Sequence, residues 1–76
     1  MIELYILETC PFCRKVMEFF DDNNIKYEKK NILEKENLDK LVKKGGKQQV
    51  PFLVDTDNNK FMYESDDIIK YVKNKG

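Results

Sequence analysis

The sequence predicts a single α/β domain, residues 1–76, in which four strands form a mixed sheet and three helices flank it on both faces. Short apolar segments of strand length alternate with segments whose apolar residues recur at helical spacing. Near the end of the chain, two apolar segments are separated only by a polar turn, which indicates a hairpin. The length of 76 residues suits one domain with a modest core. The expected order of elements is therefore β-α-β-α-β-β-α.

A strand and a helix open the chain. Residues 2–7 are apolar except for Glu3, which is typical of a central strand that is covered on both faces. We expect a helix to begin near Thr9 and Pro11, because proline is favoured in a first helical turn, where its missing N–H would have no partner. Four apolar side chains form one face of this helix: Val16, Met17, Phe19 and Phe20. The polar residues 21–24 end it.

The second strand and the second helix follow. Residues 25–32 contain the strand, with Tyr27 as its clearest inward-facing side chain. Polar flanks indicate that this strand lies at an edge of the sheet, and the crossover from the first strand should be right-handed. Three apolar residues at helical spacing mark the buried stripe of the second helix: Leu38, Leu41 and Val42. Gly45 and Gly46 should supply its left-handed C-terminal cap.

An antiparallel hairpin and a third helix complete the domain. Residues 52–55 and 60–63 are the two strands of the hairpin, and the polar residues 56–59 form its turn. Ser65 is expected as the N-cap of the last helix. Three apolar residues form the buried stripe of that helix: Ile68, Ile69 and Val72.

Composition narrows the class of protein. Fourteen basic and fourteen acidic side chains cancel, which argues against binding to nucleic acid or to an anionic membrane surface. No apolar run approaches the ~20 residues needed to cross a bilayer, and no signal-peptide pattern follows Met1, so the expected location is the cytoplasm. The chain has no histidine and two cysteines, too few ligands for a tetrahedral zinc site. We therefore expect no metal.

Cys10 and Cys13 are the chemical centre of the sequence. Residues three apart in the first turn of a helix share one face, so a disulfide can form between them. A ring this small gains little stability from loop closure, so redox chemistry is favoured over half a metal site or two incidental cysteines. The unpaired N–H groups and the helix dipole favour a thiolate at Cys10. Cys13 should be more buried, which makes Cys10 the attacking thiol and Cys13 the resolving thiol.

The motifs resemble those of the glutaredoxins, within the thioredoxin-fold superfamily. Residues 8–13, Glu-Thr-Cys-Pro-Phe-Cys, are close to the family's E-T-C-P-Y-C. Residues 49–51, Gln-Val-Pro, are similar to its T-V-P segment, whose proline is cis, and residues 65–67 to the C/S-D-D that opens its last helix. The resemblance implies a thioredoxin-like fold and a monomeric enzyme. Its implied activity is glutathione-dependent exchange with glutathionylated proteins and protein disulfides.

The resemblance also implies a site for glutathione as co-substrate. The backbone of Val50, beside cis-Pro51, would pair with the cysteinyl part of glutathione. Ser65 and Asp66 would take its γ-glutamyl end, through a helix N–H for the carboxylate and the Asp66 side chain for the ammonium. Lys47 or Gln49 would reach the glycyl carboxylate. The remaining implied contacts lie in the active-site turn: Thr9 and Phe12.

Two positions depart from the family pattern. Leu7 stands where many glutaredoxins have a lysine, which leaves Glu8 as the charge nearest to Cys10, where a carboxylate opposes thiolate formation. Tyr63-Glu64 replaces the usual Gly-Gly and adds bulk and negative charge beside the expected groove. One alternative is therefore a redoxin reduced by thioredoxin reductase, for example as electron donor to ribonucleotide reductase. A further alternative is a dimeric carrier of an iron–sulfur cluster bound through Cys10 and external thiols.

Overall fold

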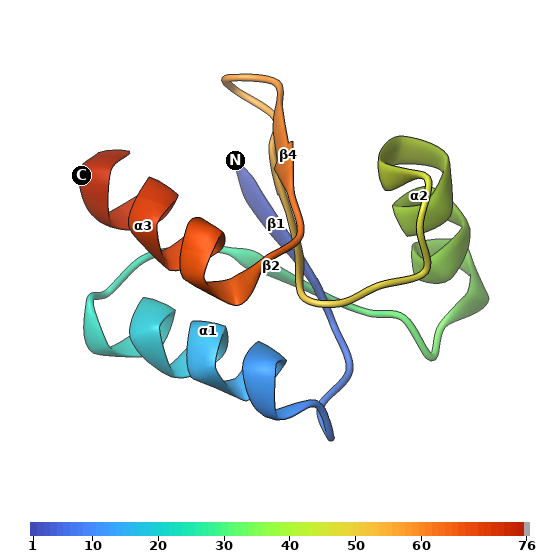
Figure 1. The fold of residues 1–76 in the computed structure, drawn as a ribbon, viewed down its shortest axis with the longest axis horizontal. Helices are drawn as coiled ribbons and strands as arrows, with labels where there is room; N and C mark the ends of the chain where they lie inside the picture. Colours follow the sequence, from blue (N-terminus) through green and yellow to red (C-terminus); the bar gives the residue numbers. More distant parts are fainter. Residues whose placement is uncertain (76) are drawn as a thin grey trace.

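Seven elements follow one another in the predicted order in the computed structural model, which describes residues 1–75. They are β1 (Ile2–Ile6), α1 (Pro11–Asp22), β2 (Glu28–Asn31), α2 (Lys35–Gly45), β3 (Phe52–Asp55), β4 (Lys60–Met62) and α3 (Ser65–Lys75) (Figure 1). The predicted alternation of strands and helices is confirmed over the whole described chain.

The four strands form one mixed sheet in the order β2-β1-β3-β4. β1 runs parallel to β2, and β3 is antiparallel to both of its neighbours, β1 and β4. In the register between the central strands, Leu4 lies opposite Leu53 and Tyr5 lies opposite Phe52. The mixed four-stranded sheet and the antiparallel hairpin are therefore as predicted.

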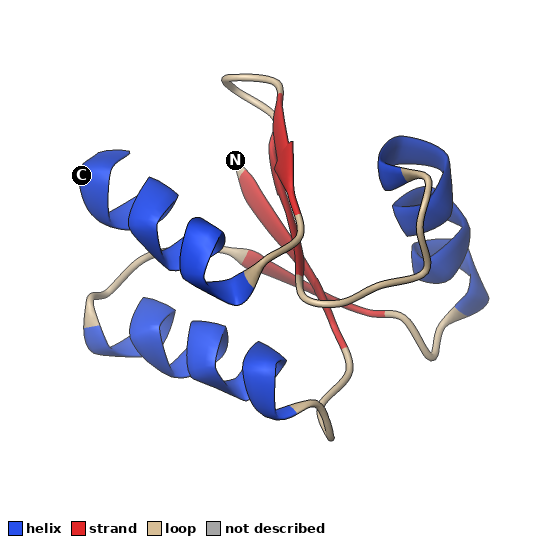
Figure 2. Ribbon diagram, viewed as in Figure 1, coloured by secondary structure: helices blue, strands red, loops and turns tan. Residues whose placement is uncertain are grey.

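Helices cover both faces of the sheet. α1 and α3 lie side by side on one face, and α2 lies alone on the other (Figure 2). Because side chains alternate along a strand, β1 and β3 contribute to both cores. The larger core, under α1 and α3, contains Ile2, Leu4, Ile6, Cys13, Val16, Phe20, Leu53, Ile68 and Val72. The smaller core, under α2, contains Tyr5, Ile32, Leu41, Phe52 and Val54.

Two predicted positions in the strands and in α2 are corrected. β2 begins at Glu28, so Tyr27 precedes it, although its ring does pack inward at 4.9 Å between centroids against Phe20. Val42 is 42% exposed and does not belong to the buried stripe of α2. Consecutive helical residues are rotated by ~100°, and Leu41 occupies the direction that faces the sheet. The left-handed cap at Gly46 is confirmed, with φ of 82°.

The ends of β4 and α3 also differ from prediction. β4 ends at Met62, so Tyr63 lies in the connection to α3. α3 begins at Ser65, and the carbonyl of Glu64 accepts the first helical hydrogen bond from the N–H of Ile68 at 2.9 Å. Glu64 therefore stands before the first turn, and Ser65 is the first helical residue rather than the N-cap.

A buried carboxylate at the end of β3 connects the hairpin turn to α3. Asp55 is 0% exposed. It accepts hydrogen bonds from the N–H of Asp57 at 3.1 Å, from the side-chain amide of Asn58 at 3.0 Å and from the hydroxyl of Tyr71 at 2.6 Å. These bonds compensate the loss of hydration that burial of a carboxylate entails.

Candidate functional site

The predicted site residues converge at one end of the central strands, because β1 and β3 are antiparallel neighbours and β1 ends where β3 begins. Tyr5, near the end of β1, lies opposite Phe52, the first residue of β3. The loop from β1 to Cys10 therefore leaves the sheet beside the point where the segment before β3 enters it. The peptide bond between Val50 and Pro51 in that segment is cis, as the resemblance implied.

Cys10 is the N-cap residue of α1. Its backbone is extended, with φ of −82° and ψ of 120°, and Pro11 opens the helix after it. The carbonyl of Cys10 accepts the N–H of Arg14 at 3.0 Å. Its side chain makes no capping hydrogen bond and is partly exposed. The sulfur therefore lies at the positive end of the helix, where first-turn N–H groups lack helical partners and an incoming disulfide can reach it.

Cys13 lies one turn further along α1 and is 0% exposed. Burial raises the pKa of the Cys13 thiol from about 9 to about 12. A hydrogen bond and a charge interaction with Cys10 act in the same direction, and a backbone hydrogen bond with Leu7 acts against them. The Cys13 thiol is thus protonated at neutral pH and within hydrogen-bonding reach of Cys10. The two thiols are chemically unequal in the way that an attacking and a resolving cysteine require.

A groove of about 340 Å³ lies between α1, the segment before β3 and the start of α3. Its lining residues are Phe12, Gln49, Val50, Pro51, Tyr63, Glu64, Ser65 and Asp66. Of the residues that the resemblance implied for glutathione, Thr9 and Lys47 do not line it. A larger hollow of about 450 Å³ lies beside the hairpin turn and α3, and none of its lining residues comes from the active-site turn. Neither cysteine lines either hollow, but the smaller one is lined by Phe12, which stands between the two cysteines in the sequence, and it is therefore the candidate site.

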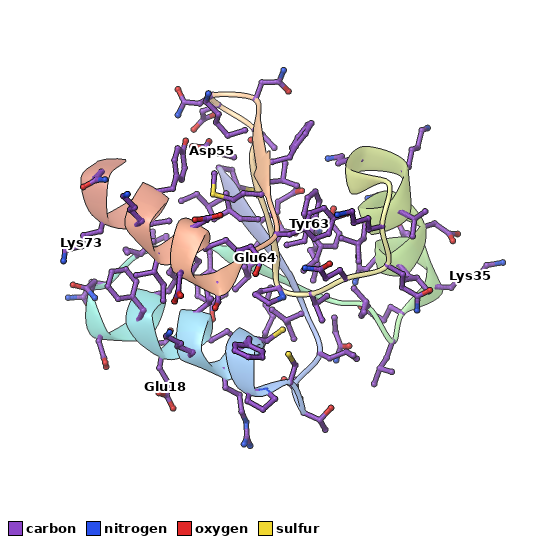
Figure 3. The ribbon with its side chains drawn as sticks, viewed as in Figure 1. Glu18, Lys35, Asp55, Tyr63, Glu64 and Lys73 are labelled. Carbon is purple, nitrogen blue, oxygen red and sulfur yellow. The ribbon has the colours of Figure 1, made fainter. Side chains whose placement is uncertain are left out.

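Acidic side chains dominate the α3 side of the groove. Glu64 lies at the start of α3 (Figure 3) and accepts a long hydrogen bond of 3.4 Å from the side-chain amide of Gln49. The carboxylate of Asp66 forms an ion pair with Lys15 of α1 at 2.8 Å, and both side chains are mostly exposed. No sequence pattern indicates the role of Lys15, because it lies 51 residues from Asp66 and only the packing of α1 against α3 joins them.

Glu8, the carboxylate nearest to Cys10 in the sequence, has a basic partner. Its Oε1 accepts a hydrogen bond from Nζ of Lys29 in β2 at 3.1 Å. Parallel pairing of β1 with β2 places Lys29 opposite Leu4, close enough to the β1–α1 loop for this contact. The positive charge of Lys29 therefore offsets the negative charge that the sequence alone places beside the thiol.

Tyr63, which the sequence analysis expected to add bulk beside the groove, is one of its lining residues. Its side chain lies between β4 and α2 (Figure 3) and packs against Phe52, with ring centroids 4.6 Å apart. Its hydroxyl contacts the main chain of Lys47, and the Lys47 ammonium lies 5.8 Å from the Tyr63 ring centroid. Lys47 therefore contacts the groove through Tyr63 rather than by lining it.

Residues 1–75 contain no group of three or more cysteine, histidine, aspartate or glutamate side chains arranged to hold a metal ion. In the same part of the chain, no helix is long and apolar enough to cross a membrane.

Comparison with known protein families shows which family the chain belongs to. The family described as the N-terminal domain of glutathione S-transferases matches residues 4–75. The chain belongs to this family. Membership in the glutathione S-transferase N-terminal domain family agrees with the four-stranded mixed sheet and three helices seen here, and the predicted thioredoxin-like fold is confirmed.

The resemblance to glutaredoxins is confirmed as well. Glutaredoxin 2 of Escherichia coli K12 is 35% identical over 71 residues, which are 93% of this chain and 32% of that protein. Glutaredoxin 1 of Rickettsia felis is 38% identical over 53 residues, which are 66% of this chain and 52% of that protein. A crystal structure of glutaredoxin 2 from Salmonella typhimurium in complex with glutathione matches with a TM-score of 0.82 and 34% identity, over 97% of this chain and 33% of that one. The chain thus spans about a third of the length of the two glutaredoxin 2 proteins.

Proposed function

We propose that the protein is a glutathione-dependent thiol–disulfide oxidoreductase. The observation that carries the proposal is the unequal pair of thiols at the start of α1: Cys10 is partly exposed at the helix N-terminus, and Cys13 is buried with its pKa raised to about 12. A single thiolate of this kind can attack a disulfide while its neighbour keeps its proton. The adjoining groove supplies a surface for the disulfide substrate.

The reaction begins at Cys10. Its thiolate attacks the glutathione sulfur of a mixed disulfide, a new S–S bond forms between Cys10 and glutathione, and the target leaves as a thiolate that takes up a proton. A second glutathione thiolate then attacks the glutathione sulfur bound to Cys10. This step releases oxidised glutathione and regenerates the Cys10 thiolate. The route consumes one free glutathione thiol for each target thiol that it releases, joins it to the glutathione that left the target, and does not use Cys13.

Reduction of a protein disulfide uses both thiols. Cys10 attacks one sulfur of the target, and the first target thiolate leaves. Cys13 then attacks the Cys10 sulfur of the mixed disulfide, closes the Cys10–Cys13 disulfide and releases the second target thiolate, which takes the Cys13 proton. In the reduced protein, burial raises the pKa of the Cys13 thiol, and Cys13 attacks only when its proton is removed.

The groove offers groups suited to the parts of glutathione. The backbone of Val50, next to cis-Pro51, is positioned to pair with the cysteinyl part in an extended conformation. At the α3 end, the first-turn N–H groups suit the γ-glutamyl carboxylate. The carboxylates of Glu64 and Asp66 suit its ammonium, and Lys15 must share Asp66 with it. The glutathione complex of the Salmonella glutaredoxin 2 supports glutathione as the ligand.

The test is reduction of a glutathione mixed disulfide, with glutathione and glutathione reductase supplying electrons. We expect wild type to turn over, Cys10→Ser to be inactive and Cys13→Ser to stay active, because the glutathione route does not need Cys13. A wild type that is inactive with glutathione but turns over with thioredoxin reductase would refute the glutathione assignment. It would support the alternative that Leu7 and the groove-lining Glu64 favour.

A further inference from the structure

We propose that Tyr63 is a positioning residue, whose hydroxyl fixes the segment that presents Val50 to the substrate. The inference rests on the proposed function and adds a residue that touches neither thiol. The segment of residues 46–51 lies outside the helices and strands and carries two groove-lining positions before Pro51, Gln49 and Val50. A main-chain surface that binds an extended ligand must be held in one conformation, since ordering it on binding would cost affinity.

The hydroxyl of Tyr63 makes two hydrogen bonds to one residue of that segment. It donates to the carbonyl of Lys47 at 2.9 Å and accepts from the N–H of Lys47 at 3.1 Å. A residue whose N–H and C=O are both bound has little freedom to rotate about its φ and ψ angles. The Lys47 side chain folds over the same ring, with its Nζ at 5.8 Å from the centroid. We call this pair of residues, Tyr63 and Lys47, the clasp.

The surroundings of Tyr63 are shaped to admit its ring. The ring packs at 4.6 Å from that of Phe52, the first residue of β3. The ring also lies close to the end of α2, where Gly45 has no side chain. A Cβ on Gly45 would meet the Tyr63 hydroxyl directly, and it would lie 2.7 Å from Cζ of Tyr63 and 3.1 Å from Cε1 of Phe52. The close approach therefore depends on glycine at position 45, and the clasp joins α2, the segment and β3.

The Tyr63 side chain also lines the groove, so the residue that holds Lys47 in place is itself part of the proposed binding surface. Val50 lies three residues after Lys47. The side chain of the intervening Gln49 donates a long hydrogen bond of 3.4 Å to Glu64. The two bonds to Lys47 are shorter and restrain the main chain itself. Loss of the hydroxyl should loosen residues 47–50 while leaving the thiols of α1 in place.

The first test compares Tyr63→Phe with the matched change Tyr27→Phe. Tyr63→Phe keeps the ring against Phe52 and removes both bonds to Lys47. We expect its KM for the glutathione mixed disulfide to rise about three- to tenfold, as loss of one or two hydrogen bonds of ordinary strength predicts. Its kcat should stay within about twofold of wild type, because Cys10 and Cys13 are untouched. Tyr27→Phe, on the opposite face of the sheet, should change neither constant.

The second test displaces Tyr63 without altering it. Gly45→Ala places a methyl group where the hydroxyl lies, so it should raise the same KM. Gly45→Ala should raise this KM much less when added to Tyr63→Ala than in wild type, because the ring it displaces is gone and only the contact with Phe52 remains. Independently of catalysis, hydrogen exchange of the Lys47 amide should be faster in Tyr63→Phe than in wild type and unchanged in Tyr27→Phe.

The outcomes separate this inference from the proposed function. If wild type turns over and Tyr63→Phe has an unchanged KM, Tyr63 is not a positioning residue and the proposed function stands. A fall in kcat or in Tm with unchanged KM would make Tyr63 a structural residue only and would also overturn the inference. A wild type without turnover on glutathione substrates would refute the proposed function, and the inference with it.

Discussion

Raising the pH should destabilise the reduced protein through the buried thiol of Cys13. The pKa of this group is about 12 in the folded chain, against an ordinary value of about 9, chiefly because the thiolate would be buried. Between these two values the unfolded chain has lost the Cys13 proton and the folded chain has kept it. The unfolded state then binds fewer protons, so the free energy of unfolding falls as the pH rises.

The size of the effect follows from the two pKa values. At pH 7 both states are protonated at Cys13 and the contribution is negligible. At pH 10 the unfolded thiol is mostly ionised and the folded thiol is not, which lowers the free energy of unfolding by about 1 to 2 kcal/mol. Total stabilities are typically 5 to 15 kcal/mol, so the loss is measurable. Burial also raises the pKa of Tyr5 to about 12, which adds a smaller loss of the same sign at this pH.

The assay is urea unfolding under reducing conditions at pH 7 and pH 10, for wild type and Cys13→Ala. The variant removes the thiol and keeps the contribution of Tyr5, so comparing the pH-induced changes cancels both the Tyr5 effect and the packing cost of the substitution. We expect wild type to lose about 1 to 2 kcal/mol more than Cys13→Ala between the two pH values. Equal losses in the two proteins would refute the reasoning, since the Cys13 thiol would then ionise equally readily in both states.

Two further predictions concern stability, and each has a matched control on the same kind of residue. Asp55→Ala should lower the free energy of unfolding by about 2 to 4 kcal/mol, because a buried acceptor of several hydrogen bonds is lost. Asp57→Ala removes only an exposed ion pair with the N-terminus and should cost less than about 1 kcal/mol. Similarly, Leu41→Ala, at a side chain with 0% exposure, should cost about 2 to 5 kcal/mol. Leu33→Ala, at 80% exposure, should fall within about 0.5 kcal/mol of wild type. Urea unfolding at pH 7 checks all four values, and similar costs within either pair would contradict the burial argument.

Local patterns in the sequence were enough to predict the order of elements. Hydrophobic periodicity reflects which face of a strand or helix is buried, and the glycine at the end of α2 adopts the left-handed cap that its sequence position indicated. Boundaries were less accurate. Tyr27 and Ser65 each lie one residue or less from an element end, where local propensities on the two sides nearly balance. Val42 was misassigned because spacing alone does not show which of two adjacent apolar residues faces the sheet.

The sequence by itself determined the arrangement of the two thiols. Both lie at the N-terminus of a helix, and their exposure differs because Cys13 follows Cys10 by one helical turn. Only the tertiary structure decided what surrounds them. Lys15 meets Asp66 across 51 residues, and Tyr63 meets Lys47 across 16. Such contacts leave no periodic signal, because they depend on how helices pack on the sheet rather than on the conformation of either segment. The groove itself exists only where α1, the segment before β3 and the start of α3 are brought to one edge by the antiparallel pairing of β1 with β3.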